Sequence, residues 1–164
     1  MNLKLSFSFV GIIIFSLPII INIFYVIFPP KQNDAKDNAQ KGGIIEIIEN
    51  VSRIAYLAAV TLLVSQRPLR FTSPWLYIAA VFLALYYAAW IRYFASGSDV
   101  AMLFKSFLFV PLPLAVFPVL YFLFCAIWMH NIPAAAVMTV FGAAHITVTY
   151  RSFKRRSTAK GQEQ

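Results

Sequence analysis

A group of polar side chains lies in the apolar segment that begins at Ile44, and its members are spaced by three and four positions. They are Glu46, Glu49, Asn50 and Arg53. At helical spacing these residues share one face. Carboxylates on such a face can carry a proton or a cation, and an arginine beside them can stabilise their ionised form or hold an anionic group. The pattern therefore predicts a site for an ion, a proton or a small polar headgroup.

Three further polar residues interrupt other apolar segments and are candidate contributors to the same site: Asn22, Arg92 and His145. Ionisable groups inside a membrane cost about 2.5 to 3.5 kcal/mol each at mid-helix, so they usually have a role. If the apolar segments alternate in direction, all three residues fall in the half of the bundle that holds Glu49. We therefore expect a polar cavity that opens toward the cytoplasm.

A purely structural role explains the same residues. Glu49 and Arg53 are four positions apart, in the favourable order for an ion pair along a helix. Such pairs can simply hold a helix bundle together, and each is worth about 1 kcal/mol or less. His145 follows three small residues, so its ring can pack at a close helix contact as readily as it can relay a proton. Both interpretations stay open.

The stretch from Phe141 to His145 has the form Phe-x-x-x-His. It is similar to a motif of the intramembrane prenyl-protein peptidases, which also carry two adjacent glutamates and an arginine four residues after the second. Arg53 follows Glu49 by four positions, but one of the paired glutamates and a second histidine motif are absent from this sequence. The resemblance implies an intramembrane enzyme. Metal chemistry needs several convergent ligands, and we predict no catalytic residue, no metal site and no cofactor.

The composition of the chain restricts its class. Of 164 residues, 60% are hydrophobic and 12% are charged, and the mean hydropathy is +0.73. Soluble domains are nearer half apolar and a quarter charged, so a soluble globule and a disordered chain are both excluded. The single cysteine excludes a disulfide scaffold. We predict an all-α polytopic integral membrane protein whose main partner is the lipid bilayer. Its net charge of +8 suits cytoplasmic loops, and no nucleic-acid partner is expected.

Five apolar runs are long enough to span a bilayer, which takes about 20 residues. They form one transmembrane domain, residues 1–150, with helices at about 5–28, 44–65, 74–94, 107–129 and 131–150. A polar linker from Pro29 to Gly43 follows the first run, which we interpret as a retained helix and not as a cleaved signal peptide. Residues 151–164 form a basic cytoplasmic tail that frays after one or two turns.

The basic residues predict the orientation. With five spans, one side of the membrane holds Lys4, Arg67 and Arg70. The other side holds ten: Lys31, Lys36, Lys41, Arg92, Lys105, Arg151, Lys154, Arg155, Arg156 and Lys160. The positive-inside rule places the N-terminus outside the cell membrane and the C-terminus in the cytoplasm. A rival arrangement makes the proline-containing fourth run re-entrant, which gives four spans and a weaker contrast. We prefer an unwound or kinked start to a fourth spanning helix.

Small and aromatic residues indicate packing and depth. Ala80, Ala84 and Ala88 repeat every four positions, which allows close helix contact within the chain or along a dimer seam. Aromatic belts mark membrane interfaces. Trp75 and Tyr77 mark one end of the third run, Trp90 and Tyr93 mark the other end, and Trp128 lies near the outer edge. The leading hypothesis is a transporter-like or ligand-binding membrane protein that works as a homo-oligomer or with a larger membrane partner. The alternatives are a non-catalytic subunit or regulator of a complex, and an intramembrane enzyme.

Overall fold

The computed structural model describes residues 3–27 and 43–160, which are mostly helical. The linker predicted after the first run lies outside the described residues except for Gly43, and its three lysines lie outside them too. The elements in chain order are β1 (Leu3–Leu5), α1 (Phe9–Ile27), α2 (Ile44–Leu62), β2 (Leu63–Ser65), α3 (Pro74–Ala95), α4 (Val100–Phe104), α5 (Pro113–Trp128) and α6 (Ile132–Lys160).

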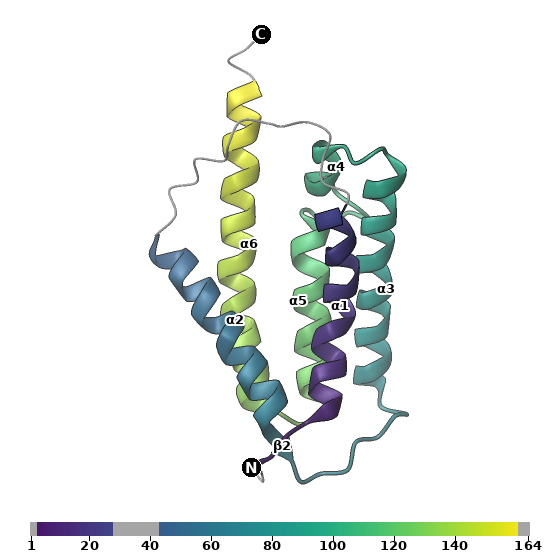
Figure 1. The fold of residues 1–164 in the computed structure, drawn as a ribbon, viewed down its shortest axis with the longest axis vertical. Helices are drawn as coiled ribbons and strands as arrows, with labels where there is room; N and C mark the ends of the chain where they lie inside the picture. Colours follow the sequence, from purple (N-terminus) through teal and green to yellow (C-terminus); the bar gives the residue numbers. More distant parts are fainter. Residues whose placement is uncertain (1–2, 28–42, 161–164) are drawn as a thin grey trace.

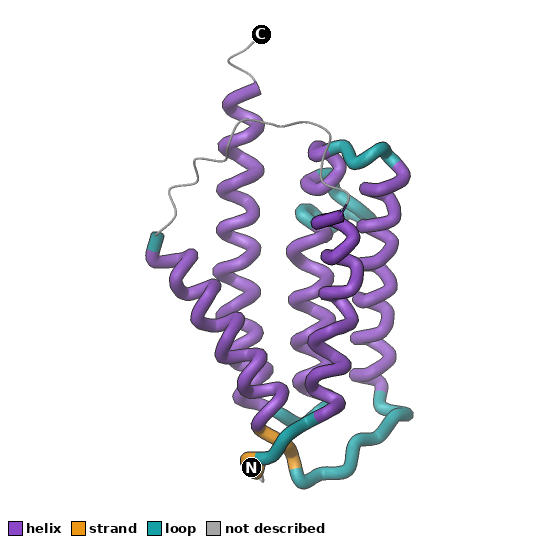
Figure 2. Tube along the Cα trace, viewed as in Figure 1, coloured by secondary structure: helices purple, strands orange, loops and turns teal. Residues whose placement is uncertain are grey.

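The long helices form a bundle in which each long helix runs opposite to the one that precedes it in the chain (Figure 1). Helices α1, α3 and α6 lead away from the end that holds β1 and β2, and α2 and α5 lead back to it. We call this the hairpin end. The principal contacts join α3 to α5, α5 to α6, and α6 to α2, which crosses α6 obliquely. The helices thus place the start of β1 and the end of α6 at opposite ends (Figure 2).

Three described helices are long and apolar enough to cross a membrane: α1, α3, and the part of α6 from Ile132 to Arg155. Helix α5 is apolar, but its 16 residues extend only about 24 Å, less than the roughly 30 Å of a hydrocarbon core. Helix α2 carries three charged side chains within its first ten residues. The predicted all-α fold is confirmed, whereas the five spans remain a prediction.

The first helix begins later than its hydropathy indicates. Residues Leu3–Leu5 form β1, which pairs antiparallel with β2, and α1 starts at Phe9 and not at Leu5. The amide of Ser6 donates to the carbonyl of Leu62 at 2.9 Å, so the chain before α1 pairs with backbone groups at the end of α2. Apolar residues serve a strand as well as a helix, and hydropathy alone cannot separate the two in so short a segment.

The fourth apolar run is helical only from Pro113, so the predicted start at residue 107 is wrong. Its first residues form a tight turn in which Phe107 and Val110 exchange backbone hydrogen bonds. Leu108, Phe109 and Leu112 have positive φ angles, which non-glycine residues seldom adopt. Prolines restrict the preceding residue away from the helical region. Pro111 and Pro113 therefore explain the unwound start that the sequence indicated.

Helix α6 continues through Lys160, well beyond residue 150, where the fifth run was predicted to end. The basic tail, expected to fray after one or two turns, is helical for about one turn more than that, and the expectation is wrong only for residues 158–160. The hydroxyls of Ser157 and Thr158 donate to carbonyls one turn earlier within this extension. Ring contact between Phe153 and Phe104, 5.5 Å between centroids, holds the extension against α4.

A proline inside α1 determines how that helix meets α5. Pro18 has no N–H, so the carbonyl of Ile14 lacks its intrahelical donor. The hydroxyl of Tyr121 on α5 donates to this carbonyl at 3.0 Å. Tyr87 on α3 donates to the carbonyl of Leu17 at 2.6 Å. These two bonds attach the middle of α1 to the rest of the bundle.

Two glycines allow close helix contacts. A Cβ on Gly11 would collide with the carbonyl of Val60, where α1 crosses α2. A Cβ on Gly142 would lie 2.5 Å from Cγ1 of Val119, where α6 meets α5. This second contact lies beside Phe141 and one turn from His145, so it fixes how close the α6 site residues come to α5.

The alanine repeat of α3 does not pack inside the bundle. Ala80 and Ala84 are exposed and Ala88 is half-buried, whereas Ala79, Tyr86 and Ala89 face the interior. Of the two arrangements predicted for this repeat, contact within the chain is therefore wrong, and contact along a dimer seam stays a prediction.

Candidate functional site

The carboxylate of Glu49 on α2 meets two cationic or protonatable groups. Its Oε1 accepts a hydrogen bond from Nη2 of Arg53 at 2.6 Å, one turn further along α2. The same oxygen lies 3.0 Å from Nδ1 of His145 on α6. A carboxylate can only accept, so Nδ1 carries the proton and Nε2 is left for another partner. One oxygen of Glu49 thus joins α2 to α6.

Phe141 forms the apolar side of this group. Its ring stacks on the imidazole of His145, with 5.1 Å between centroids and 12° between planes. The guanidinium carbon of Arg53 lies 5.6 Å from the centre of the same ring, a distance at which a cation is attracted to the π face. Phe141 and His145 are one turn apart on α6. The aromatic ring therefore limits the positions of both side chains that contact Glu49.

Burial differs sharply among the three polar side chains. The side chain of Glu49 is 10% exposed, that of His145 is 26% exposed and that of Arg53 is 50% exposed. The carboxylate therefore lies behind the two side chains that an incoming molecule would reach first. The most exposed of the three, Arg53, presents N–H donors to an approaching group.

A cleft of about 430 Å³ opens beside this group. Every long helix contributes to its lining, through Asn22 on α1, Arg53 on α2, Tyr86 on α3, Pro118 on α5 and His145 on α6. The cleft has the size of an ordinary small-molecule site, which ranges from about 300 to 1,000 Å³. The bundle as a whole, and not one helix pair, therefore forms the hollow.

The far wall of the cleft is also polar. The hydroxyl of Tyr86 donates to Oδ1 of Asn22 at 2.6 Å. This bond occupies the side-chain oxygen of Asn22. The side-chain nitrogen, which is a donor, remains for a ligand. Together with the guanidinium of Arg53, the amide gives the cleft more donors than acceptors. Such a lining favours a ligand with acceptor oxygens.

The other predicted site residues lie elsewhere. Glu46 is half-buried and Asn50 is exposed, one turn before Glu49 and beside it on α2, and neither lines the cleft. Arg92 lies near the end of α3, where its guanidinium donates to the carbonyls of Lys105 at 2.7 Å and Ser106 at 2.9 Å. Its guanidinium carbon is 5.0 Å from the ring centre of Phe107. Arg92 thus holds the chain between α4 and α5.

The structure adds residues that the sequence did not single out for the site. Tyr86 and Pro118 line the cleft, and Tyr56, which continues the α2 face, reaches across it to donate to the carbonyl of Phe122 at 2.9 Å. Each depends on a contact between distant helices. Two of the added residues had a local signal: Tyr56 by its helical spacing from Arg53, and Phe141 by its place in the Phe-x-x-x-His motif.

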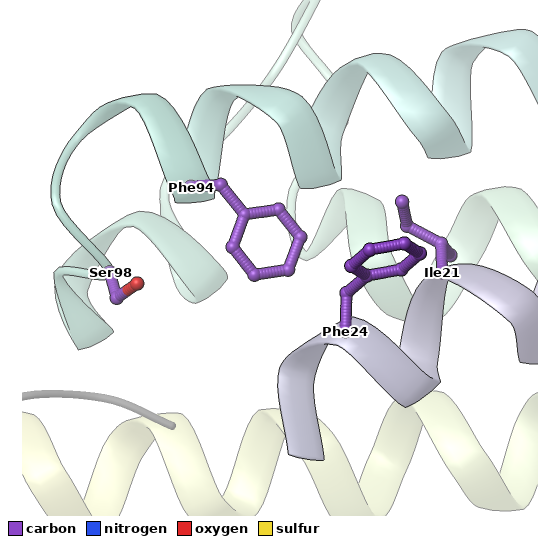
Figure 3. Close-up of a pocket in the computed structure, with 4 residues that line it drawn as sticks. All are labelled: Ile21, Phe24, Phe94 and Ser98. Carbon is purple, nitrogen blue, oxygen red and sulfur yellow. The ribbon is translucent and has the colours of Figure 1, made fainter. Parts of the chain in front are cut away.

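A second hollow, of about 380 Å³, lies between α1 and the end of α3 (Figure 3). Figure 3 shows Ile21 and Phe24 of α1 and Phe94 of α3 around it, with Ser98 at its margin. The lining is almost wholly apolar, so this hollow offers no partner for a charged group.

In the part of the chain that the structure describes, no three His, Cys, Asp or Glu side chains are grouped so that they could hold a metal ion. Comparison with protein-family models, with curated proteins and with solved structures gave no match.

Proposed function

We propose that this chain is a membrane protein with five spans, in which α2 and α5 cross beside α1, α3 and α6. The antiparallel course of all five long helices supports this arrangement (Figure 1). The short α5 is compatible with it, because the chain before Pro113 extends the fourth apolar run, and Arg92 anchors that chain through the carbonyls of Lys105 and Ser106.

The charge distribution supports an orientation in which the hairpin end is extracytoplasmic. Among the described residues, the hairpin end carries Lys4, Arg67 and Arg70. The opposite end carries Arg92 and Lys105 and, along the extended part of α6, Arg151, Lys154 and Arg155. The positive-inside rule assigns the second group to the cytoplasm.

The function that the geometry supports best is binding, and coupled transport, of a small anion in the five-helix cleft. The observation that carries this proposal is the sharing of one Glu49 oxygen between Arg53 and His145 at the wall of that cleft. With a neutral imidazole the group has no net charge. A proton on Nε2 makes it positive, and an anion bound by Arg53 and Asn22 then restores neutrality. Proton and anion would therefore enter together.

A binding assay tests this proposal on the purified full chain in detergent. The probes are lactate, succinate and inorganic phosphate, and the readout is the shift in melting temperature with ligand concentration. We expect at least one probe to stabilise the wild type, and Asn22→Ala and Arg53→Gln to remove that shift. Glu46→Gln is the matched control, because it alters a carboxylate on the same helix outside the cleft. Equal shifts in all variants, or none in the wild type, would refute anion binding.

A transport assay separates coupled movement from simple binding. Proteoliposomes that contain a pH-sensitive dye receive an inward gradient of the anion that binds. We expect the lumen to acidify with the wild type, and the acidification to be lost in Glu49→Gln and His145→Gln. Retained binding without acidification in the wild type would support a ligand-binding subunit or regulator in place of a transporter.

One contact favours a second candidate, an intramembrane hydrolase. Glu49 holds Nδ1 of His145 and leaves Nε2 to act as a general base toward water, while Arg53 could stabilise an oxyanion. The enzyme hypothesis predicts turnover of small ester or peptide substrates that His145→Gln abolishes without loss of binding. If mass spectrometry detects no products across such a panel while anion binding is intact, the hydrolase hypothesis is rejected and the anion-binding proposal is kept.

A further inference from the structure

The hairpin end contains a separate basic pocket, remote from the Glu49 cleft. It has a volume of about 440 Å³ and lies between the chain from Gln66 to Ser73, the start of α3 and the turn that joins α5 to α6. Its polar lining includes Arg67, Arg70 and His130. The volume is within the usual range for small-molecule sites. The pocket therefore combines a ligand-sized hollow with a strong positive charge.

Among the residues that the structure describes, no carboxylate lies at the hairpin end to compensate the charge of this pocket. The acidic side chains of the described residues are Glu46, Glu49 and Asp99, which belong to the beginning of α2 and to the turn after α3. Glu49 contacts Arg53 and His145, in a part of the bundle away from this pocket. Arg67 and Arg70 thus keep their guanidinium groups for a partner from outside the described part of the chain.

The backbone that carries these arginines is held in place. The carbonyl of Arg70 accepts from the indole Nε1 of Trp128 at 2.8 Å and from the amide of Ser73 at 3.1 Å. The ring of Phe71 packs on the same indole, with 5.7 Å between centroids. Ser73 stands at the N-cap of α3, yet its hydroxyl makes no capping bond and lines the pocket instead. The loop is therefore prepared to offer donors without first becoming ordered.

His130 occupies a backbone position that normally selects glycine. Its φ is 53°, and its amide and that of Asn131 donate back to the carbonyls of Ile127 and Ala126 at 2.9 Å each. This is the pattern of a Schellman cap, in which the left-handed residue is usually Gly. A histidine there costs backbone strain and places an imidazole in the lining of the basic pocket.

We propose that this pocket binds a phosphate group. Two guanidinium groups can each donate two parallel hydrogen bonds to phosphate oxygens, and the hydroxyls of Thr72 and Ser73 and the imidazole of His130 add further donors. Trp75 and Trp128 also line the pocket, and tryptophan marks the level of lipid headgroups in membrane proteins. Two sources carry this chemistry, the headgroup of an anionic phospholipid and free phosphate.

The test uses the full chain in detergent and its intrinsic fluorescence, because two of its three tryptophans line the pocket. The probes are dioctanoyl phosphatidylglycerol, dioctanoyl phosphatidylcholine and inorganic phosphate. We expect a saturable change with at least one probe, and a loss of affinity of about tenfold or more in the Arg67→Gln/Arg70→Gln double variant. Lys154→Gln removes one charge at the opposite end of the bundle and should bind like the wild type.

Comparison of the three probes identifies the source of the phosphate group. Saturation by phosphatidylglycerol but not by inorganic phosphate assigns the pocket to lipid, and the reverse assigns it to the free ion. An Arg67→Lys/Arg70→Lys variant, folded by circular dichroism, should bind more weakly than the wild type because lysine lacks the two-pronged geometry. The absence of saturable binding, or an equal loss of affinity in Lys154→Gln and the double glutamine variant, would overturn the proposal.

Discussion

Nδ1 of His145 lies 3.0 Å from Oε1 of Glu49, although 96 positions separate the two residues in the chain. The contact joins α2 to α6 at the wall of the cleft, and Arg53 completes it from the same helix as Glu49. It also connects the two places where the sequence resembles the motifs of the prenyl-protein peptidases, Glu49 with Arg53 and Phe141 with His145. Every functional hypothesis for the cleft depends on this one contact.

A double-mutant cycle measures that contact. We expect Glu49→Gln and His145→Gln to destabilise the protein singly, and the double variant to lose less than their sum. The coupling energy should be about 0.5 to 1.5 kcal/mol, typical of hydrogen bonds between membrane helices. The measurement is unfolding in mixed micelles, followed by circular dichroism. Additive losses would show that the two side chains do not interact in the folded protein.

The bond from Tyr121 to the proline-exposed carbonyl of α1 gives a second prediction. Tyr121→Phe should cost about 1 to 2 kcal/mol of unfolding free energy, because the carbonyl of Ile14 loses its donor. Pro18→Ala restores a backbone N–H to that carbonyl. The tyrosine substitution should therefore cost measurably less in the Pro18→Ala background. An equal cost in both backgrounds would show that the contribution of the Tyr121 hydroxyl does not depend on Pro18, and would contradict this prediction.

The contact at Gly142 predicts a compensating pair. Gly142→Ala places a Cβ about where Val119 already lies, so the variant should lose about 1 to 3 kcal/mol in stability and weaken the contact between Glu49 and His145. Val119→Ala removes the colliding methyl groups and should restore part of the loss. Thermal unfolding of the two single variants and the double variant checks this. Two losses that simply add would indicate that α5 and α6 are not in close contact there.

Strain at His130 predicts a stabilising substitution. His130→Gly relieves the left-handed backbone conformation and should raise the free energy of unfolding by about 0.5 to 1 kcal/mol. Under the phosphate proposal the same substitution should weaken binding in the fluorescence assay. Thr139→Gly, at a helical position of α6, is the contrasting control and should destabilise. An unchanged or lower melting temperature for His130→Gly would contradict the claim that the backbone at His130 is strained.

The sequence alone determined the helical class and most helix positions, because apolar runs of this length need internally paired backbone. It also placed Glu49 and Arg53 on one helix face, since that relation depends only on the helical repeat. The end of α6 was missed because a polar tail without a breaker can continue a helix, and β1 was missed because its pairing depends on a distant strand.

Only the tertiary structure decided which helix faces meet. The bond between Asn22 and Tyr86, the contact of Glu49 with His145, and the exposure of Ala84 all depend on how the helices rotate against one another. That rotation is selected by the shapes of many contacting side chains at once, such as Gly142 against Val119. Periodicity within a single segment has no information about a partner segment. The sequence therefore predicted a polar cavity, but the contacts that shape the cleft, and the basic pocket, could only be found in the folded chain.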